Sequence, residues 1–154
     1  MCGDHHSRDV AGGALAVMSP SPFTTTAAFP IPMAGRLVFY NRTAENLVAT
    51  HAMLTVDSCC EPQFNAKEPV LVRIHETGDL TKPASTSPSW ASFSLKPIVR
   101  NNTVDGRTPP VDAGLELGRP FKIEVGIDGI VGRRVSVWTQ KGVGPIAEGI
   151  VGFN

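Results

Sequence analysis

Residues 117–129, LGRPFKIEVGIDG, have the pattern of a β-strand that ends in a tight turn. Phe121, Ile123 and Val125 alternate with charged residues, so apolar and charged side chains point to opposite faces of an extended backbone. The Asp128-Gly129 pair that follows is typical of a turn. A strand with one apolar and one wet face needs other strands to bury the same side, which favours a β-sheet protein.

Further segments along the chain carry the same kind of pattern. Their apolar residues alternate loosely with polar ones, and none shows three turns of helical periodicity. Fifteen Gly and 13 Pro favour many turns between short strands. The fold class predicted is all-β, a two-sheet antiparallel β-sandwich or jelly roll. The expected strands are 35–41, 46–57, 69–76, 91–102 (one or two strands), 120–128, 133–140 and 147–153.

The length of 154 residues predicts a single domain. Residues 1–21 show no periodicity and are expected to form a flexible N-terminal tail, followed by the β-sandwich domain at 22–154. The apolar run GGALAVM, residues 12–18, is too short to span a membrane and does not favour a signal peptide. Three cysteines are a poor disulfide framework and fit a reducing compartment. We therefore expect a cytoplasmic location, or secretion without a classical signal peptide.

The charge balance excludes several classes of partner. Fourteen basic and 14 acidic residues leave no net charge, so neither nucleic acid nor membrane insertion is expected. No phosphate-binding loop is present, and no cofactor is expected. Cys59 and Cys60 lie near His51 in sequence, yet nothing orients a base toward a thiol. The chain is therefore predicted not to be an enzyme.

A second cluster, at the N-terminus, has the donor types of a metal site. Cys2, Asp4, His5 and His6 are close in sequence, but they fall in the expected tail, where no scaffold fixes their geometry. Adventitious binding is the better interpretation, and no metal site is predicted.

Binding chemistry is more plausible on the strand at 70–76. Arg73, His75 and Thr77 share one face, while Val72 and Ile74 anchor the other. Such forked and planar donors suit pairs of sugar hydroxyls, although an ordinary solvated strand face has the same pattern. Two long connections rich in Pro, Ser, Thr, Asp and Gly, 77–89 and 102–114, are expected to border a site.

Several segments, taken in order, resemble the galectin family of galactoside-binding lectins. PFTTTAAFPIPMAGRLVFYN, HAMLTVDSC, EPVLVRIHETGD, KPIVRNNTVDG, AGLELGRPFKIEVGID and RRVSVWTQ follow the order and spacing of the family's strands. The similarity covers roughly residues 22–153. It implies a two-sheet jelly roll in which 35–41, 70–76, 91–101 and 120–138 pair as neighbouring antiparallel ribbons, with residues 73, 75 and 101 in one open trough.

The resemblance also implies a function. Arg73, His75 and Thr77 fall where the family carries His-x-Asn-Pro-Arg, and Asn101 or Asn102 matches the following Asn. Arg107 or Thr108 falls near the position of the family's Trp, and Trp90 is a candidate for supplying a ring from elsewhere. This implies a divergent carbohydrate-binding module with altered or lost β-galactoside specificity. The expected ligand-binding residues are Arg73, His75, Thr77, Asn101, Asn102 and Arg107.

The partner implied by this interpretation is a glycan or glycoprotein. The alternative is a non-enzymatic β-sandwich used for protein–protein interaction or self-assembly, with a homodimer as the expected form.

Overall fold

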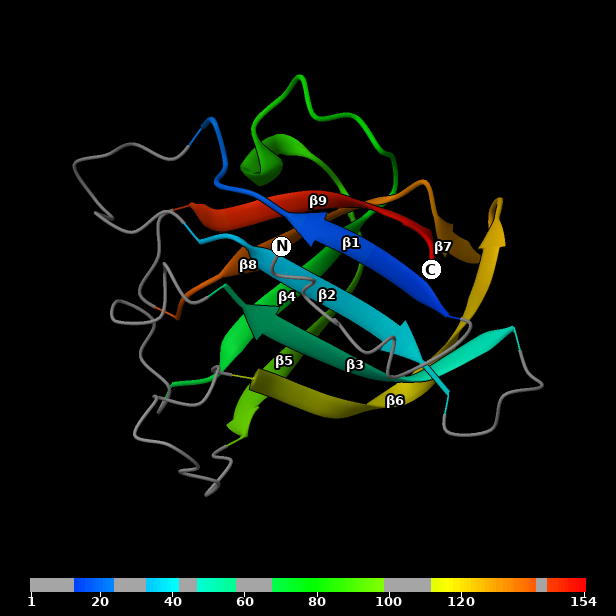
Figure 1. Ribbon diagram of the computed structural model, residues 1–154. Helices are drawn as coiled ribbons and strands as arrows, with labels where there is room; N and C mark the ends of the chain where they lie inside the picture. The colour runs from blue at the N-terminus through cyan, green and yellow to red at the C-terminus, as the bar shows by residue number, and fades with distance from the viewer. Residues whose placement is uncertain (1–12, 24–32, 42–46, 58–67, 99–111, 141–143) are drawn as a thin grey trace, which may run out of the picture.

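A computed structural model describes residues 13–23, 33–41, 47–57, 68–98, 112–140 and 144–154 (Figure 1). Within these ranges the regular structure is almost entirely β, because the alternating apolar residues found in the sequence line one face of each extended segment. The elements are β1 (Ala14–Met18), β2 (Gly35–Tyr40), β3 (Val48–Val56), β4 (Val70–His75), the 3-10 turn η2 (Ala84–Thr86), β5 (Ser89–Ile98), β6 (Asp112–Val125), β7 (Gly129–Val131), β8 (Arg134–Trp138) and β9 (Pro145–Phe153).

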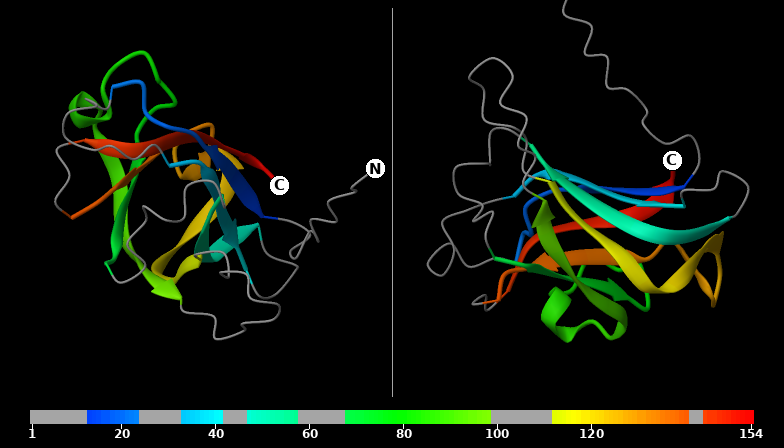
Figure 2. Two further views of the ribbon diagram at one scale, coloured as in Figure 1. Left: turned by 60° about the vertical axis from the view of Figure 1, so that its left-hand side comes forward. Right: turned by 90° about the horizontal axis from the view of Figure 1, so that it is seen from below.

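The strands close into a barrel. They are hydrogen-bonded in the order β3-β2-β1-β9-β8-β4-β5-β6, and β6 pairs back onto β3, so the ring has eight members. Every pairing within the ring is antiparallel. The short strand β7 lies outside the ring and pairs with β6 in parallel. Figure 2 shows the strands wrapping around a common interior.

This closure overturns the predicted two-sheet sandwich and jelly roll. A sandwich needs two sheets that each end in free edges, whereas the β3–β6 ladder runs from Val48 opposite Lys122 to Thr55 opposite Asp112 and joins the two ends. The all-β class is confirmed, and the architecture is not. The jelly-roll arrangement that the galectin resemblance implied is corrected with it.

One strand of the ring lies within the segment expected to be a flexible tail. β1 pairs with β2 from Ala14 opposite Phe39 to Met18 opposite Gly35, and with β9 from Ala14 opposite Phe153 onward. Its inward side chains Ala14, Ala16 and Met18 are buried. The strand was missed because it is only five residues long and its buried residues are mostly alanine, a weak strand former.

The other expected strands lie close to observed ones, and their expected neighbours are confirmed in part. β4 pairs with β5 and β8, and β5 pairs with β6, all antiparallel. β2 pairs with β1 and β3, not with β4, so 35–41 and 70–76 are not adjacent ribbons. β6 begins at Asp112, inside the connection expected at 102–114, and is 14 residues long. The remainder of that connection lies outside the described residues.

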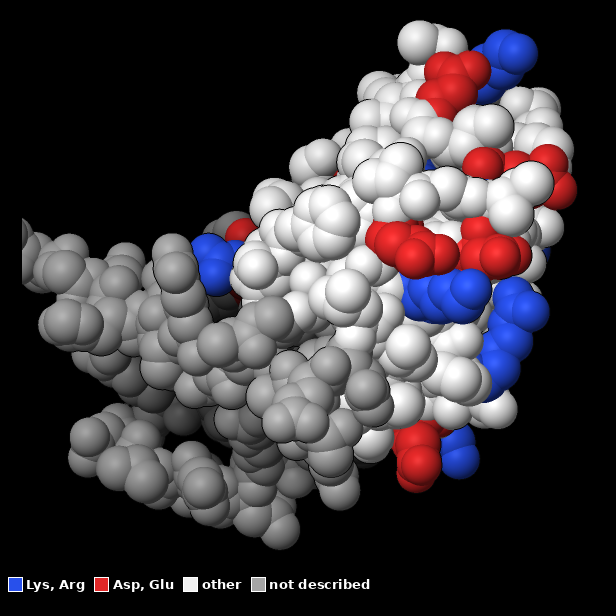
Figure 3. Space-filling model, turned by 90° about the vertical axis from the view of Figure 1, so that its right-hand side faces the viewer, with Lys and Arg blue, Asp and Glu red and all other residues white. Residues whose placement is uncertain are grey.

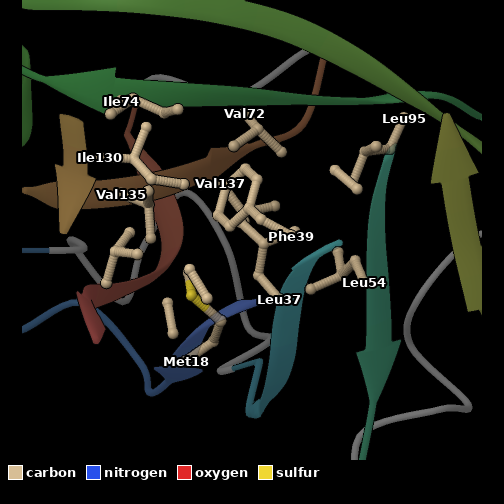
Figure 4. Packing of buried hydrophobic residues seen from close by; sticks show 14 of the residues in the cluster. Met18, Leu37, Phe39, Leu54, Val72, Ile74, Leu95, Ile130, Val135 and Val137 are labelled. Atoms are coloured by element: carbon tan, nitrogen blue, oxygen red, sulfur yellow. The ribbon is translucent and has the colours of Figure 1, made fainter. Parts of the chain in front are cut away.

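The barrel interior is filled by apolar side chains from all parts of the ring (Figure 4). Phe39 is at its centre and contacts the rings of Phe93 and Phe121 edge-on, with ring centroids 6.2 and 6.4 Å away. An eight-stranded barrel is just wide enough to be filled by its own side chains or to hold one small ligand. Here buried apolar side chains of the described residues occupy the interior.

A pair of substitutions tests whether β1 belongs to the barrel. Ala16 is fully buried and its neighbour Val17 is 67% exposed, because successive side chains of a strand point to opposite faces. We expect Ala16→Asp to lower the free energy of unfolding by about 4 kcal/mol or more, since it places a charge in the apolar interior. Val17→Asp is expected to change it by less than about 0.5 kcal/mol. Urea denaturation of both variants checks this, and equal, small effects would contradict the placement of β1.

Candidate functional site

The outer face of β4 carries two of the residues that the sequence singled out. Arg73 and His75 point outward, and Val72 and Ile74 point into the barrel opposite Val137 and Val135 of β8. The Arg73 guanidinium lies over the Trp138 ring, 4.5 Å from its centroid. A cation against an indole face gains electrostatic attraction, so Arg73 is held to the barrel wall.

A strap, residues 76–88, covers this face. It connects β4 to β5, contains η2, and passes over β4 and β8 at the top of Figure 1. Arg134 holds it, because its Nη1 donates hydrogen bonds to the carbonyls of Asp79 and Lys82 at 2.9 and 2.7 Å. The same guanidinium pairs with the carboxylate of Glu148, Nη2 to Oε2 at 2.6 Å, and both side chains are buried. The Ser21 hydroxyl donates to the other oxygen of Glu148 at 2.5 Å.

His75 is fully buried beneath the strap and has a partner on each ring nitrogen. Nδ1 lies 3.3 Å from the Ser87 carbonyl, and Nε2 lies 2.7 Å from the Ser136 hydroxyl. A carbonyl only accepts, so the neutral ring carries its proton on Nδ1 and accepts from Ser136 at Nε2. Trp138 Nε1 in turn donates to Ser136 Oγ at 2.8 Å. The result is one directed chain of hydrogen bonds from Trp138 to the strap.

These contacts show where the residues expected to bind a ligand lie. Arg73 is half-buried, His75 is sealed, and Thr77 is exposed at the start of the strap, where its carbonyl accepts from the Arg134 backbone amide. The described part of the expected trough is therefore covered, not open. Asn101, Asn102 and Arg107 lie outside the described residues, and ligand binding by this set stays a prediction.

Ser136 and His75 have the separation of a nucleophile and its base, but not the surroundings. Both are fully buried, and the second ring nitrogen faces a carbonyl instead of a carboxylate. The pair therefore serves to attach the strap. Across the described ranges, no three His, Cys, Asp or Glu side chains are grouped as a metal site would require. The described residues likewise contain no helix of the length and apolarity needed to cross a membrane.

The seam between β5 and β6 is only partly hydrogen-bonded. The two strands pair only from Lys96 opposite Gly114 to Ile98 opposite Asp112. Beyond that point they diverge, as the right-hand view of Figure 2 shows. The β3–β6 ladder also breaks its register here, since His51 is opposite Glu116 whereas Ala49 is opposite Phe121. Residues 117–120 therefore form a bulge in β6.

The sequence explains this bulge. Pro120 has no N–H to donate to a ladder, and Gly118 lacks the side chain that would pack against a neighbouring strand. Bulges bend a strand away from its partner and are common beside functional sites. Here the bend separates β6 from β5 and opens the wall.

A pocket of about 390 Å³ fills the opening. This volume lies toward the lower end of the range for small-molecule sites, about 300 to 1,000 Å³. Phe93 and Phe121 form its inner side, with ring centroids 6.2 Å apart, and Trp90 lies 5.6 Å from Phe121. The lining residues are Ala91, Ser92, Phe93, Leu117, Gly118, Arg119 and Phe121.

Two arginines flank the Trp90 ring at this seam. Arg133 lies 4.3 Å from the ring centroid, and its guanidinium donates to the carbonyls of Glu76, Gly129 and Ile127 at 2.6 to 2.7 Å. It therefore ties the strand ends together. Arg119 is exposed at the pocket rim and lies 5.1 Å from the Trp90 centroid and 5.4 Å from that of Phe121. Among the described residues, no carboxylate or carbonyl accepts a hydrogen bond from it.

Sequence reasoning did not find this pocket, although four of its seven lining residues lie in the stretch quoted first. The sequence predicts a strand that starts at Pro120, just after Gly118, whereas the observed strand begins at Asp112. A glycine and a proline inside a long strand are the signal that would have indicated the bulge. Trp90, considered as a ring supplied from elsewhere, does lie beside this pocket.

No protein family model matches the chain, and no curated protein is similar to it. The function of the site therefore has to be inferred from its geometry.

On the face shown in Figure 3, acidic and basic side chains lie next to one another, with no broad field of one sign. Lys122, for example, lies 3.7 Å from Asp128.

The chain of hydrogen bonds at His75 predicts a pH-dependent stability. Burial lowers the pKa of His75 below its ordinary value of 6.5, although the hydrogen bond to Ser87 opposes this effect. The unfolded chain therefore binds a proton at pH values where the folded protein does not. The free energy of unfolding should fall as the pH is lowered through about 6.5, by at most about 1.4 kcal/mol per pH unit.

Urea denaturation between about pH 7.5 and pH 5.5 checks this expectation. His75→Gln keeps a polar side chain but cannot titrate, so its stability should vary less with pH than that of the parent. His51→Gln, a change on the half-exposed outer face of β3, is the control and should retain the parental dependence. Parallel pH profiles for the parent and His75→Gln would contradict the assignment.

Proposed function

We propose that this protein is a non-enzymatic binding protein that takes up one compact, largely apolar molecule in the pocket between β5 and β6. The observation that carries the proposal is the opening itself. The β5–β6 seam of the barrel is hydrogen-bonded only between Lys96–Ile98 and Asp112–Gly114, and aromatic rings line the part where the two strands diverge. Apolar pockets with a few polar groups at the rim are the usual form of a small-molecule site.

The chemistry of the lining supports binding over catalysis. Ser92 and Arg119 are the polar side chains among the lining residues, and neither has an imidazole, carboxylate or thiol beside it in that set. Nothing there provides a general base. Phe93, Phe121 and Leu117 offer apolar surface, and burying it against a ligand is worth about 25 cal/mol per Å².

Carbohydrate binding and self-assembly, the roles expected from the sequence, stay predictions. Aromatic rings also cover the C–H face of sugars, so a sugar is the competing occupant of this pocket. A dimer formed by edge-to-edge pairing would have to use β7 or an opened seam, because the strands of the ring already have partners on both sides.

Filling the pocket with the protein's own side chains tests the proposal. Ala91 lies opposite Ile74 on the inward side of β5 and lines the pocket, so Ala91→Leu adds carbon atoms to its space. We expect the affinity for N-phenylnaphthylamine, a neutral dye that fluoresces out of water, to fall by at least about tenfold, because the dye loses its contact surface. The free energy of unfolding should stay equal or rise by up to about 1 kcal/mol, since a cavity is filled.

Ser94→Leu is the matched control. It adds the same side chain to β5 at an exposed position and should leave dye binding unchanged. Leu117→Phe fills the pocket from β6 and guards against a poorly folded Ala91 variant. A full-length protein that does not bind the dye, or that binds it equally well after both fillings, would refute the proposal. Displacement of the dye by lactose would favour the carbohydrate-binding role instead.

A further inference from the structure

Arg119 differs from Arg133 and Arg134 in its partners. Arg134 is bound to a carboxylate and two carbonyls, and Arg133 donates to carbonyls of four residues. Arg119 has only the faces of Trp90 and Phe121 beside it within the described structure. Its five N–H groups are therefore held at the mouth of the pocket, available to a ligand.

The residues that line the pocket carry a single charge, which is positive. Of the residues that line it, none is acidic, and Arg119 is the only charged one. Arg133 brings a second guanidinium to the same indole, and its described hydrogen bonds go to carbonyls, which leave its charge in place. An anion at the mouth would meet attraction from both groups, strengthened by the apolar wall.

The aromatic contacts fix the position of this charge. A guanidinium stacked on two rings has fewer conformations than a free one, so less freedom is lost when it binds an anion. The fork of Arg119 also matches the paired oxygens of a carboxylate or sulfonate. Its place directly over Phe121 sets the anionic group next to the apolar part of the pocket.

From this arrangement we infer that the ligand is a compact aromatic anion, with its rings in the pocket against Phe93 and Phe121 and its anionic group on Arg119. The inference rests on the proposed function, because it names the class of molecule that the same pocket would take. Arg119 is then the residue that determines specificity.

Two dyes with the same aromatic rings distinguish the effect of the ligand's charge on affinity from the effect of its rings. Anilinonaphthalene sulfonate and N-phenylnaphthylamine share the naphthalene and phenyl rings, and only the first carries an anionic group. The full-length protein should bind the sulfonate about tenfold more tightly than the neutral dye, as expected of charge-assisted hydrogen bonds at a partly exposed rim. Arg119→Gln should bind the two dyes with about equal affinity, because only the affinity for the sulfonate falls. Its affinity for the neutral dye should change by less than about twofold.

Two further variants make this result specific. Arg119→Lys keeps the charge without the fork and should retain part of the preference. Arg36→Gln removes an exposed arginine from the outer face of β2 and should leave both affinities unchanged. Equal affinities of the two dyes in the parent, or an equal loss of affinity for both in Arg119→Gln, would overturn this inference but not the proposed function. A parent protein that does not bind the neutral dye would instead overturn the proposed function.

Discussion

Closure of the ring of strands is the constraint on which the structure depends. An unpaired strand edge exposes a row of backbone donors and acceptors, and a barrel removes such edges by pairing its first strand with its last. In this protein β3 and β6 make that final pairing, from Val48 opposite Lys122 to Thr55 opposite Asp112. The apolar interior, the strap and the pocket all take their positions from it.

Polar side chains on the two sides of the barrel have different surroundings. Over β4 and β8, carbonyls of the strap are hydrogen-bond partners of His75 and Arg134, and Arg134 in turn pairs with Glu148. Buried charges need such partners, because desolvation without them is strongly unfavourable. At the β5–β6 seam the guanidinium of Arg119 stays exposed beside an apolar pocket. The buried, paired groups of the first side are suited to stability, and the exposed guanidinium of the second is suited to recognition.

Sequence alternation was enough to predict β-strands but not the way in which they close. Inward and outward side chains alternate identically in a sandwich and in a barrel. The deciding strand was β1, which lies between β2 and β9. Without Ala14–Met18, β2 and β9 would be the free edges of one open sheet. The weak strand signal of ALAVM therefore hid the closure of the ring.

The site was missed for a related reason. An outward face such as Arg73 and His75 attracts notice because its residues are polar and regularly spaced, yet the structure seals His75 under residues that are distant in sequence. The pocket instead arises where regularity fails. Gly118 and Pro120 interrupt β6, the ladder with β5 ends at Gly114, and the rings that would have packed against a continuous wall are left facing an opening. A local break in strand pattern therefore carries more information about this site than the pattern itself.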